Sequence, residues 1–114
     1  MPILRLLTNV EIIPESRPAL MARVSRAVAE ILGKPESYVM VILESGRDLI
    51  FAGTADPAAY LELKSLGLPE SRTPAFSHAL CTLLADTLGL PPARVYIEFT
   101  APPRPLFGWN GATF

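Results

Sequence analysis

The stretch LGKPESYVMV at residues 32–41 has a counterpart in LGLPPARVYI at residues 88–97, and these two stretches decide the fold. Each begins at the end of a helical pattern, passes a glycine and a proline that stop the helix, and continues into a β-prone run. The second stretch begins 56 residues after the first, which is about half of the 114-residue chain. A repeat of this period predicts that one supersecondary unit occurs twice in tandem.

The helix that leads into the first stretch is predicted over residues 15–35. Ser16 can cap its start, and Pro18 suits its first turn, where a missing N–H costs no hydrogen bond. Gly33 is a natural residue for a left-handed C-terminal cap. Apolar residues recur at helical spacing and form one apolar stripe: Leu20, Met21, Val24, Val28, Ile31 and Leu32.

Strands are predicted on both sides of this helix, at residues 2–8 and 38–43, followed by a short returning strand at 48–53. The run YVMVIL at 38–43 is continuously apolar, which is typical of a strand covered on both faces. The 56-residue offset lays the first strand on residues 58–63. The chain therefore divides into two pseudo-repeats, at about residues 2–57 and 58–114.

The predicted fold class is α/β (α+β by some schemes), with residues 1–114 forming one domain. Two tandem β-α-β units form a four-stranded mixed sheet, and both helices cover the same face. The opposite face carries leucine and valine as well as polar side chains and is left bare. This bare face predicts an oligomer in which sheets pack against one another around an axis. The pattern leaves the number of subunits open.

Composition limits the partners. The net charge is −1, so nothing attracts the chain electrostatically to nucleic acid or to an anionic membrane. No apolar run approaches the ~20 residues of a membrane span, and no secretory signal pattern is present. The single cysteine, Cys81, cannot form an intrachain disulfide, which fits a reducing compartment. These features favour a cytoplasmic protein.

Pro2 is the first candidate for chemistry. Removal of Met1 would turn its ring nitrogen into a secondary amine, a base that no internal residue can supply. Burial and a nearby cation, for which Lys34 is the candidate, would lower the amine pKa toward the range where a general base works best. Two plainer interpretations remain open: Pro2 as an ordinary edge-strand residue, and Lys34 as a partner of the helix dipole.

Two polar residues in the last long strand are further candidates. Tyr96 and Glu98 alternate with apolar residues and should share one face of the sheet. Glu98 stands where the first half has Ile42. A carboxylate in an otherwise apolar strand either faces solvent or lines a site.

The C-terminal tail PLFGWNGATF gathers Phe107, Trp109 and Phe114. These aromatic side chains either seal a core or a subunit contact, or they wall a pocket for an aromatic ligand. His78 is the only histidine and is expected at the surface. No Cys/His cluster has metal-ligand spacing and no glycine-rich phosphate loop is present, so neither a metal nor a cofactor is expected.

Five stretches together resemble the macrophage migration inhibitory factor and D-dopachrome tautomerase family of the tautomerase superfamily: MPILRLLTNV, ILGKP, SLG at residues 65–67, RVYIEF and GWNGATF. The resemblance runs nearly end to end with almost no gaps. It implies a homotrimer with an active site at each subunit interface. It also implies a cofactor-independent keto–enol tautomerase that acts on phenylpyruvate-like α-keto acids or dopachrome analogues.

The resemblance assigns roles to particular residues. Pro2 is implied to be the general base, and Lys34 to bind the substrate carboxylate with help from the backbone N–H of Leu66. Tyr96 and Glu98 are implied to come from the neighbouring subunit. The apolar pocket is implied to be lined by four side chains: Ile3, Phe107, Trp109 and Phe114.

The chain also departs from the family. Glu98 stands where the best-known member has an asparagine that binds a phenolic hydroxyl, and it adds negative charge near an anionic substrate. Phe107 replaces a smaller aliphatic residue, which would narrow the pocket. Ala58 and Leu61 replace the Cys-x-x-Cys of the animal cytokine, so thiol–disulfide activity is not expected.

Two other functions stay open. The first is a cytokine-like protein that binds a cell-surface receptor and has a vestigial tautomerase pocket. Animal members are secreted by a non-classical route, so the missing signal pattern does not exclude secretion. The second is a hydratase, dehalogenase or decarboxylase of the superfamily, which would need added arginines. Arg5, Arg72 and Arg104 are available, but the sequence places none of them in the site.

Overall fold

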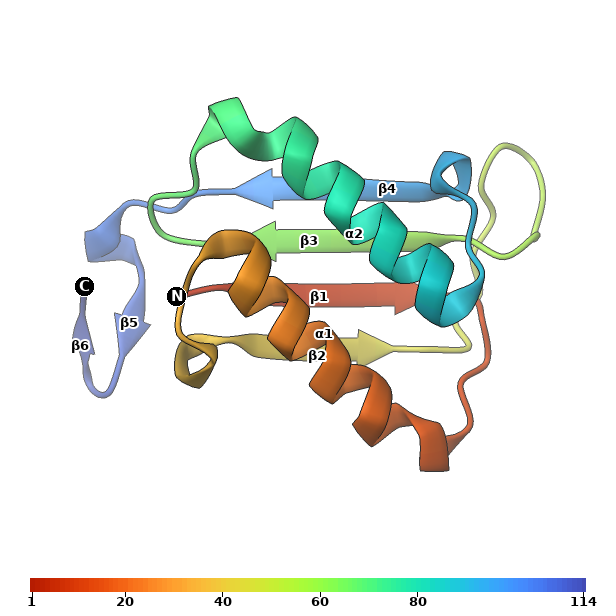
Figure 1. Cartoon of the computed structure of the whole chain (residues 1–114), viewed down its shortest axis with the longest axis horizontal. Helices are drawn as coiled ribbons and strands as arrows, with labels where there is room; N and C mark the ends of the chain where they lie inside the picture. The colour runs from red at the N-terminus through yellow and green to blue at the C-terminus, as the bar shows by residue number, and fades with distance from the viewer.

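The computed structural model describes residues 1–114 (Figure 1). Its main elements are β1 (Ile3–Thr8), α1 (Arg17–Leu32), β2 (Met40–Glu44), β3 (Ala59–Lys64), α2 (Thr73–Leu88) and β4 (Val95–Thr100). A small hairpin of β5 (Gly108–Trp109) and β6 (Ala112–Thr113) ends the chain. Neither α-helix combines the length and the apolar character that a membrane crossing requires.

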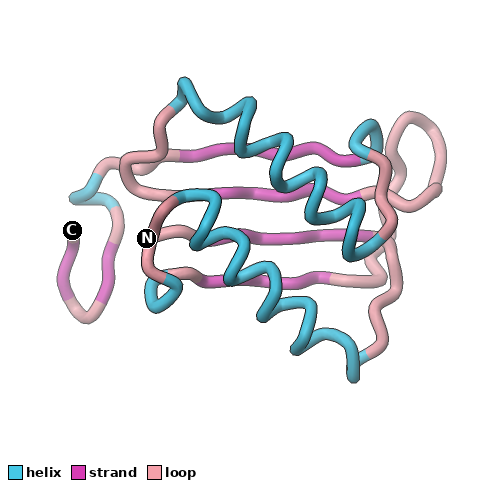
Figure 2. The backbone as a smooth tube through the Cα atoms, in the orientation of Figure 1, coloured by secondary structure: helices cyan, strands magenta, loops and turns pink.

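The four long strands form one mixed sheet in the order β2-β1-β3-β4. β1 is parallel to β2 and β3 is parallel to β4, whereas the central pair β1 and β3 is antiparallel. Both α-helices lie on the same face of this sheet (Figure 2). The predicted mixed sheet with two helices on one face is therefore confirmed.

The elements of the two halves coincide under the 56-residue offset. β1 maps onto β3, and α1 maps onto α2, with the same first and last positions. Both helices end at a glycine in the left-handed conformation, Gly33 at φ 63° and Gly89 at φ 67°. A side chain with a Cβ is strained at such a φ, which explains why a glycine stands at both positions.

The core lies between the helices and the sheet. Alternate residues of each strand point toward the helices, because successive side chains of a strand face opposite sides. The fully buried members of this layer come from both helices and from the two central strands: Val24, Val28, Phe76, Leu80, Leu84, Leu4, Leu6, Leu61 and Leu63. The residues between them in the strands point to the open face of the sheet.

The predicted returning strand at residues 48–53 is wrong. This segment belongs to the long connection from β2 to β3 and makes only an isolated bridge between Phe51 and Thr54. Arg94 holds the connection instead, because its guanidinium donates to the carbonyl oxygens of Phe51 at 2.7 Å and Asp56 at 2.7 Å. A side chain distant in sequence thus satisfies backbone groups that the local pattern assigned to a strand.

Two other local expectations are corrected. The Ser16 side chain makes no capping hydrogen bond, because a 3-10 turn at Pro14–Ser16 leads directly into α1. The strand predicted at 38–43 begins at Met40, since Tyr38 lies in a preceding 3-10 turn. It is an edge strand whose open face leaves Met40 55% exposed, so it is not covered on both faces within one chain.

Leu80 gives a direct test of this core. It is 0% exposed in the middle of α2, so we expect Leu80→Ala to lower the free energy of unfolding by about 2–5 kcal/mol. Urea denaturation at one fixed protein concentration measures this change, since assembly also contributes to stability. Leu106→Ala is the control, because Leu106 is 77% exposed and its loss should change stability by less than about 0.5 kcal/mol. Equal midpoints for the two variants would contradict the packing described here.

Candidate functional site

Two adjoining cavities open at the start of β1. The apolar cavity has a volume of about 330 Å³ and is lined by Met1, Pro2, Ile3, Ser37, Tyr38, Val39, Met40, Phe107, Gly108 and Trp109. The cationic cavity also has a volume of about 330 Å³ and is lined by Met1, Lys34, Pro35, Tyr38, Leu66, Gly67, Arg104 and Phe114. Met1 and Tyr38 line both cavities, so the two lie side by side.

The sheet topology explains why these distant segments meet. The start of β1 lies beside the start of β2 and the end of β3, because Ile3 pairs with Met40 on one side and with Lys64 on the other. The turn after β3, which contains Leu66, therefore lies at the same end of the sheet as the end of α1. The C-terminal hairpin lies at this end of the sheet, next to the N-terminus (Figure 1).

Pro2 lines the apolar cavity. Its side chain is fully buried, and its carbonyl oxygen accepts a hydrogen bond from the N–H of Met40 at 3.0 Å. Met1 is bonded to the Pro2 nitrogen in this chain, so that nitrogen is an amide and the free amine is that of Met1. Pro2 could act as a base only after removal of Met1, because its ring nitrogen would then be a free amine.

The surroundings of the amine favour its neutral form. Burial lowers the pKa of the Met1 ammonium group, and the positive charges of Lys34 and Arg104 lower it further. Neither side chain makes an ion pair, and no aspartate or glutamate lines the two cavities. The Lys34 ammonium only donates to the carbonyl oxygen of Leu66, at 3.5 Å. The site is therefore positive and open to an anion.

Aromatic side chains form one wall of the site. Trp109 and Phe114 stack with ring centroids 6.1 Å apart, and Phe107 lies 5.9 Å from Phe114. Tyr38 meets Trp109 edge-on at 5.7 Å. Tyr38 was missed as a site residue because the apolar run after it assigned it to a strand. These rings suit a ligand with an apolar or aromatic group.

The structure brings together seven of the residues singled out from the sequence: Pro2, Ile3, Lys34, Leu66, Phe107, Trp109 and Phe114. It also adds Arg104, which the sequence left unplaced. His78 is exposed on α2, away from both cavities. No group of three or more His, Cys, Asp or Glu side chains is arranged to hold a metal ion.

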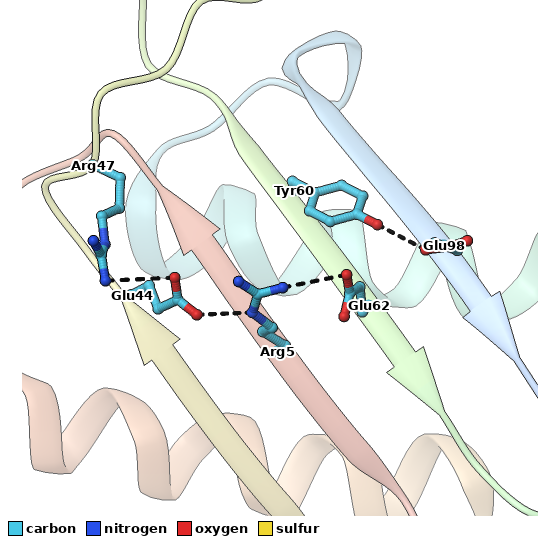
Figure 3. Close-up of polar contacts among 6 residues, drawn as sticks. All are labelled: Arg5, Glu44, Arg47, Tyr60, Glu62 and Glu98. Carbon is cyan, nitrogen blue, oxygen red and sulfur yellow. Dashed lines mark hydrogen bonds and ion pairs between the residues drawn. The ribbon is translucent and has the colours of Figure 1, made fainter.

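Tyr96 and Glu98 lie elsewhere in the same chain. Their register sets Tyr96 opposite Tyr60, which pairs with Leu7 near the far end of β1. Tyr96 packs against Phe51 with ring centroids 4.6 Å apart. The carboxylate of Glu98 accepts a hydrogen bond from the Tyr60 hydroxyl at 2.8 Å (Figure 3). A single chain therefore does not place these two residues in the cavities.

A row of charged side chains crosses the open face of the sheet (Figure 3). The Arg5 guanidinium donates to Glu44 at 2.8 Å and to Glu62 at 3.4 Å, and Arg47 lies 3.6 Å from Glu44. The hydrogen bond from Arg5 lowers the pKa of the Glu44 carboxyl, and that bond likewise raises the pKa of Arg5. The open face is thus polar across its middle, not a continuous apolar surface.

Two tandem β-α-β units with a positive, aromatic-walled cavity at the start of the first strand define a protein of the tautomerase superfamily type. The family described as macrophage migration inhibitory factor (MIF) matches residues 1–114. The chain belongs to this family, and the resemblance seen in the sequence is confirmed.

Relatives from distant organisms support this assignment. The chain is 39% identical over 117 residues to a macrophage migration inhibitory factor homolog of Trichuris trichiura, covering 100% of each chain. It is 42% identical over 98 residues to a homolog of Brugia malayi, covering 84% of each. The crystal structure of a homologue from Prochlorococcus marinus superposes with a TM-score of 0.90 at 39% identity, over 98% of each chain. Membership supports a tautomerase or cytokine-like function in general, with isomerase as the class of enzyme.

Glu98 provides a test of the open face. Its hydrogen bond with Tyr60 raises the pKa of that phenol to about 12. We expect Glu98→Gln to lower this pKa toward the usual value of about 10, because the carboxylate that favours the protonated phenol is removed. Titration of labelled tyrosines by NMR measures the shift, and Tyr60→Phe identifies the signal. Glu30→Gln, an exposed change on α1, should leave the titration unaltered. An unchanged Tyr60 titration in Glu98→Gln would refute the contact.

Proposed function

We propose that the chain is a cofactor-independent keto–enol tautomerase of phenylpyruvate-like α-keto acids, with the Pro2 nitrogen as general base after removal of Met1. The observation that carries this proposal is the buried Pro2 in the wall of the apolar cavity, next to Met1, which also lines the cationic cavity. Burial first, and then the charges of Lys34 and Arg104, lower the pKa of the Met1 amine, and the same causes would act on a Pro2 amine beside it. A neutral amine near pH 7 is the form that a base requires.

In such a reaction each of the two cavities would bind a different part of the substrate. The aromatic ring of the substrate would lie in the apolar cavity, against Ile3, Phe107 and Trp109. The substrate carboxylate would meet Lys34 and the backbone N–H of Leu66, which makes no hydrogen bond within the chain. This orientation presents the carbon next to the keto group to the proline nitrogen. Proton transfer by a positioned base contributes about 10²–10⁴-fold to the rate.

The proposal includes a homotrimer with the active sites at subunit interfaces. The open face exposes Ile42 to 39% and Tyr96 to 65%, and the neighbouring connection exposes Ile50 to 76%. Burial of such side chains against another copy would stabilise an assembly. In a trimer, Tyr96 and Glu98 of one subunit would complete the site of the next.

Assembly can be tested at Ile50, which lines a hollow beside Tyr96. We expect the protein to show three times the chain mass by light scattering. Ile50→Glu should lower this mass toward that of one chain and reduce tautomerase activity, because a buried charge disfavours the interface. Ile13→Glu is the control, since Ile13 is 58% exposed before α1 and lies outside both cavities. A wild-type mass of one or two chains would contradict the trimer.

The base is tested by Pro2→Gly. We expect kcat/KM for phenylpyruvate tautomerisation, followed by ultraviolet absorbance, to fall by about 10²–10⁴-fold while the mass of the assembly stays the same. Mass spectrometry must first establish that Met1 is absent, since an acylated proline nitrogen is not a base. Pro14→Gly, at an exposed proline before α1, should keep wild-type activity. Full activity in Pro2→Gly would exclude the proposed role.

The second candidate is a cytokine-like protein that binds a cell-surface receptor and reaches it by non-classical secretion. Its support is the name of the curated relatives, such as the macrophage migration inhibitory factor of Rattus norvegicus, which is 34% identical over 117 residues. Receptor binding that survives Pro2→Gly, in a protein without measurable tautomerase activity, would favour this candidate over the enzyme. Without such binding, a cytoplasmic enzyme is the simpler proposal.

A further inference from the structure

Arg104 is a second cation at the proposed site, in addition to Lys34, and it has no role in the reaction proposed for Pro2 and Lys34. It lines the cationic cavity together with Lys34 and Leu66. Its guanidinium has no ion pair and makes no side-chain hydrogen bond. Its charge nevertheless reaches the amine, whose pKa it lowers. An exposed arginine without a partner, at a cavity lined by no aspartate or glutamate, is available to a ligand anion.

The backbone holds Arg104 in a defined place. Proline precedes it at Pro102 and Pro103 and follows it at Pro105, and each proline ring fixes its own φ. A 3-10 turn at Arg104–Leu106 is closed by the N–H of Leu106, which donates to the carbonyl oxygen of Pro103 at 2.9 Å. The N–H of Phe107 donates to the carbonyl oxygen of Arg104 at 3.2 Å. This rigid turn fixes the backbone of Arg104 next to Phe107, which belongs to the aromatic wall of the site.

The two cationic side chains of the site favour a ligand that carries two negative charges. Lys34 and Arg104 contribute two cations, and the N–H of Leu66 adds an unused donor. The carboxylate of an α-keto acid neutralises one cation. A second negative charge appears during the reaction, when the base takes the proton from the carbon beside the keto group. The C–H electron pair then forms the carbon–carbon double bond, and the carbonyl π pair moves to the keto oxygen. Protonation of that oxygen completes the enol.

We propose that Lys34 and Arg104 form a two-cation clamp for the adjacent carboxylate and keto oxygens of an α-keto acid, with Arg104 stabilising the charge that develops on the keto oxygen. This inference rests on the proposed tautomerase function and names the group that supplies its oxyanion stabilisation. Donors aimed at a developing oxyanion are among the largest contributions to such reactions. Arginine suits the task because its planar guanidinium offers several N–H donors in a fixed geometry.

A simpler role for Arg104 would be long-range attraction of anions. An exposed charge at the rim of a site raises the rate of encounter, and added salt suppresses that effect. The clamp instead predicts an effect on kcat that persists in high salt. It also predicts that the site prefers a ligand with two negative charges at one end over a ligand with one.

Kinetics test the first consequence in three variants. Arg104→Gln should lower kcat for phenylpyruvate by about 10²-fold, at low and at high salt, and Arg104→Lys should recover part of this loss. Arg26→Gln removes the same charge from an exposed position on α1 that has no ion pair, and it should keep wild-type kcat. An effect of Arg104→Gln on KM alone, abolished by salt, would overturn the clamp in favour of attraction.

Binding tests the second consequence without turnover. Benzylmalonate carries two carboxylates on one carbon, whereas 3-phenylpropanoate has the same skeleton with one. Quenching of Trp109, the only tryptophan of the chain, reports the binding of each. We expect the wild type and Arg26→Gln to prefer benzylmalonate by at least about tenfold, and Arg104→Gln to lose this preference.

The two measurements separate failure of the clamp from failure of the proposed function. An active wild type whose Arg104→Gln variant keeps kcat and the benzylmalonate preference would overturn the clamp and leave the tautomerase proposal standing. An inactive wild type with an Arg104-dependent preference would overturn the tautomerase and support the two-cation site. An inactive wild type that shows no preference would overturn both.

Discussion

The antiparallel pairing of β1 with β3 is the constraint on which the site depends. It joins the two β-α-β halves, and its register sets Ile3 opposite Lys64. The start of the first strand consequently meets the turn after the third strand, and Leu66 reaches the cavity that Met1 and Lys34 line. A slip of one residue would exchange the two faces of a strand and would turn Arg5 toward the core. The buried leucines on the other face exclude that alternative.

The two halves are alike in backbone and different in chemistry. The position equivalent to Pro2 is Ala58, which is 0% exposed, and the position equivalent to Lys34 is Leu90, which is 1% exposed. Where the first half has Pro2 and the cation Lys34, the second half has small or apolar side chains that pack in the core. One chain therefore has one such site, although its fold repeats. The repeat supplies the framework, and the differences between its halves place the cavities beside the first strand.

Charge is distributed unevenly over this framework. Carboxylates gather on the open face of the sheet, where Glu44 and Glu62 share Arg5 and Glu98 receives the hydroxyl of Tyr60. No aspartate or glutamate lines the cavities at the start of β1, where Lys34 and Arg104 make no ion pair. Since the whole chain has a net charge of only −1, the positive site reflects the placement of its charges and not the overall composition.

The sequence by itself determined the repeat, the two helices with their glycine ends, the mixed sheet and most of the candidate site residues. These follow from periodicity, from residues with restricted backbone angles, and from motifs that lie close together in the chain. Only the tertiary structure decided that residues 48–53 form no strand, because Arg94 reaches that connection from the far end of the chain. The same holds for Arg104 and Tyr38 in the cavity and for the distance of Tyr96 and Glu98 from it. Contacts between segments far apart in sequence leave no local pattern, since they depend on strand order and register across the whole sheet.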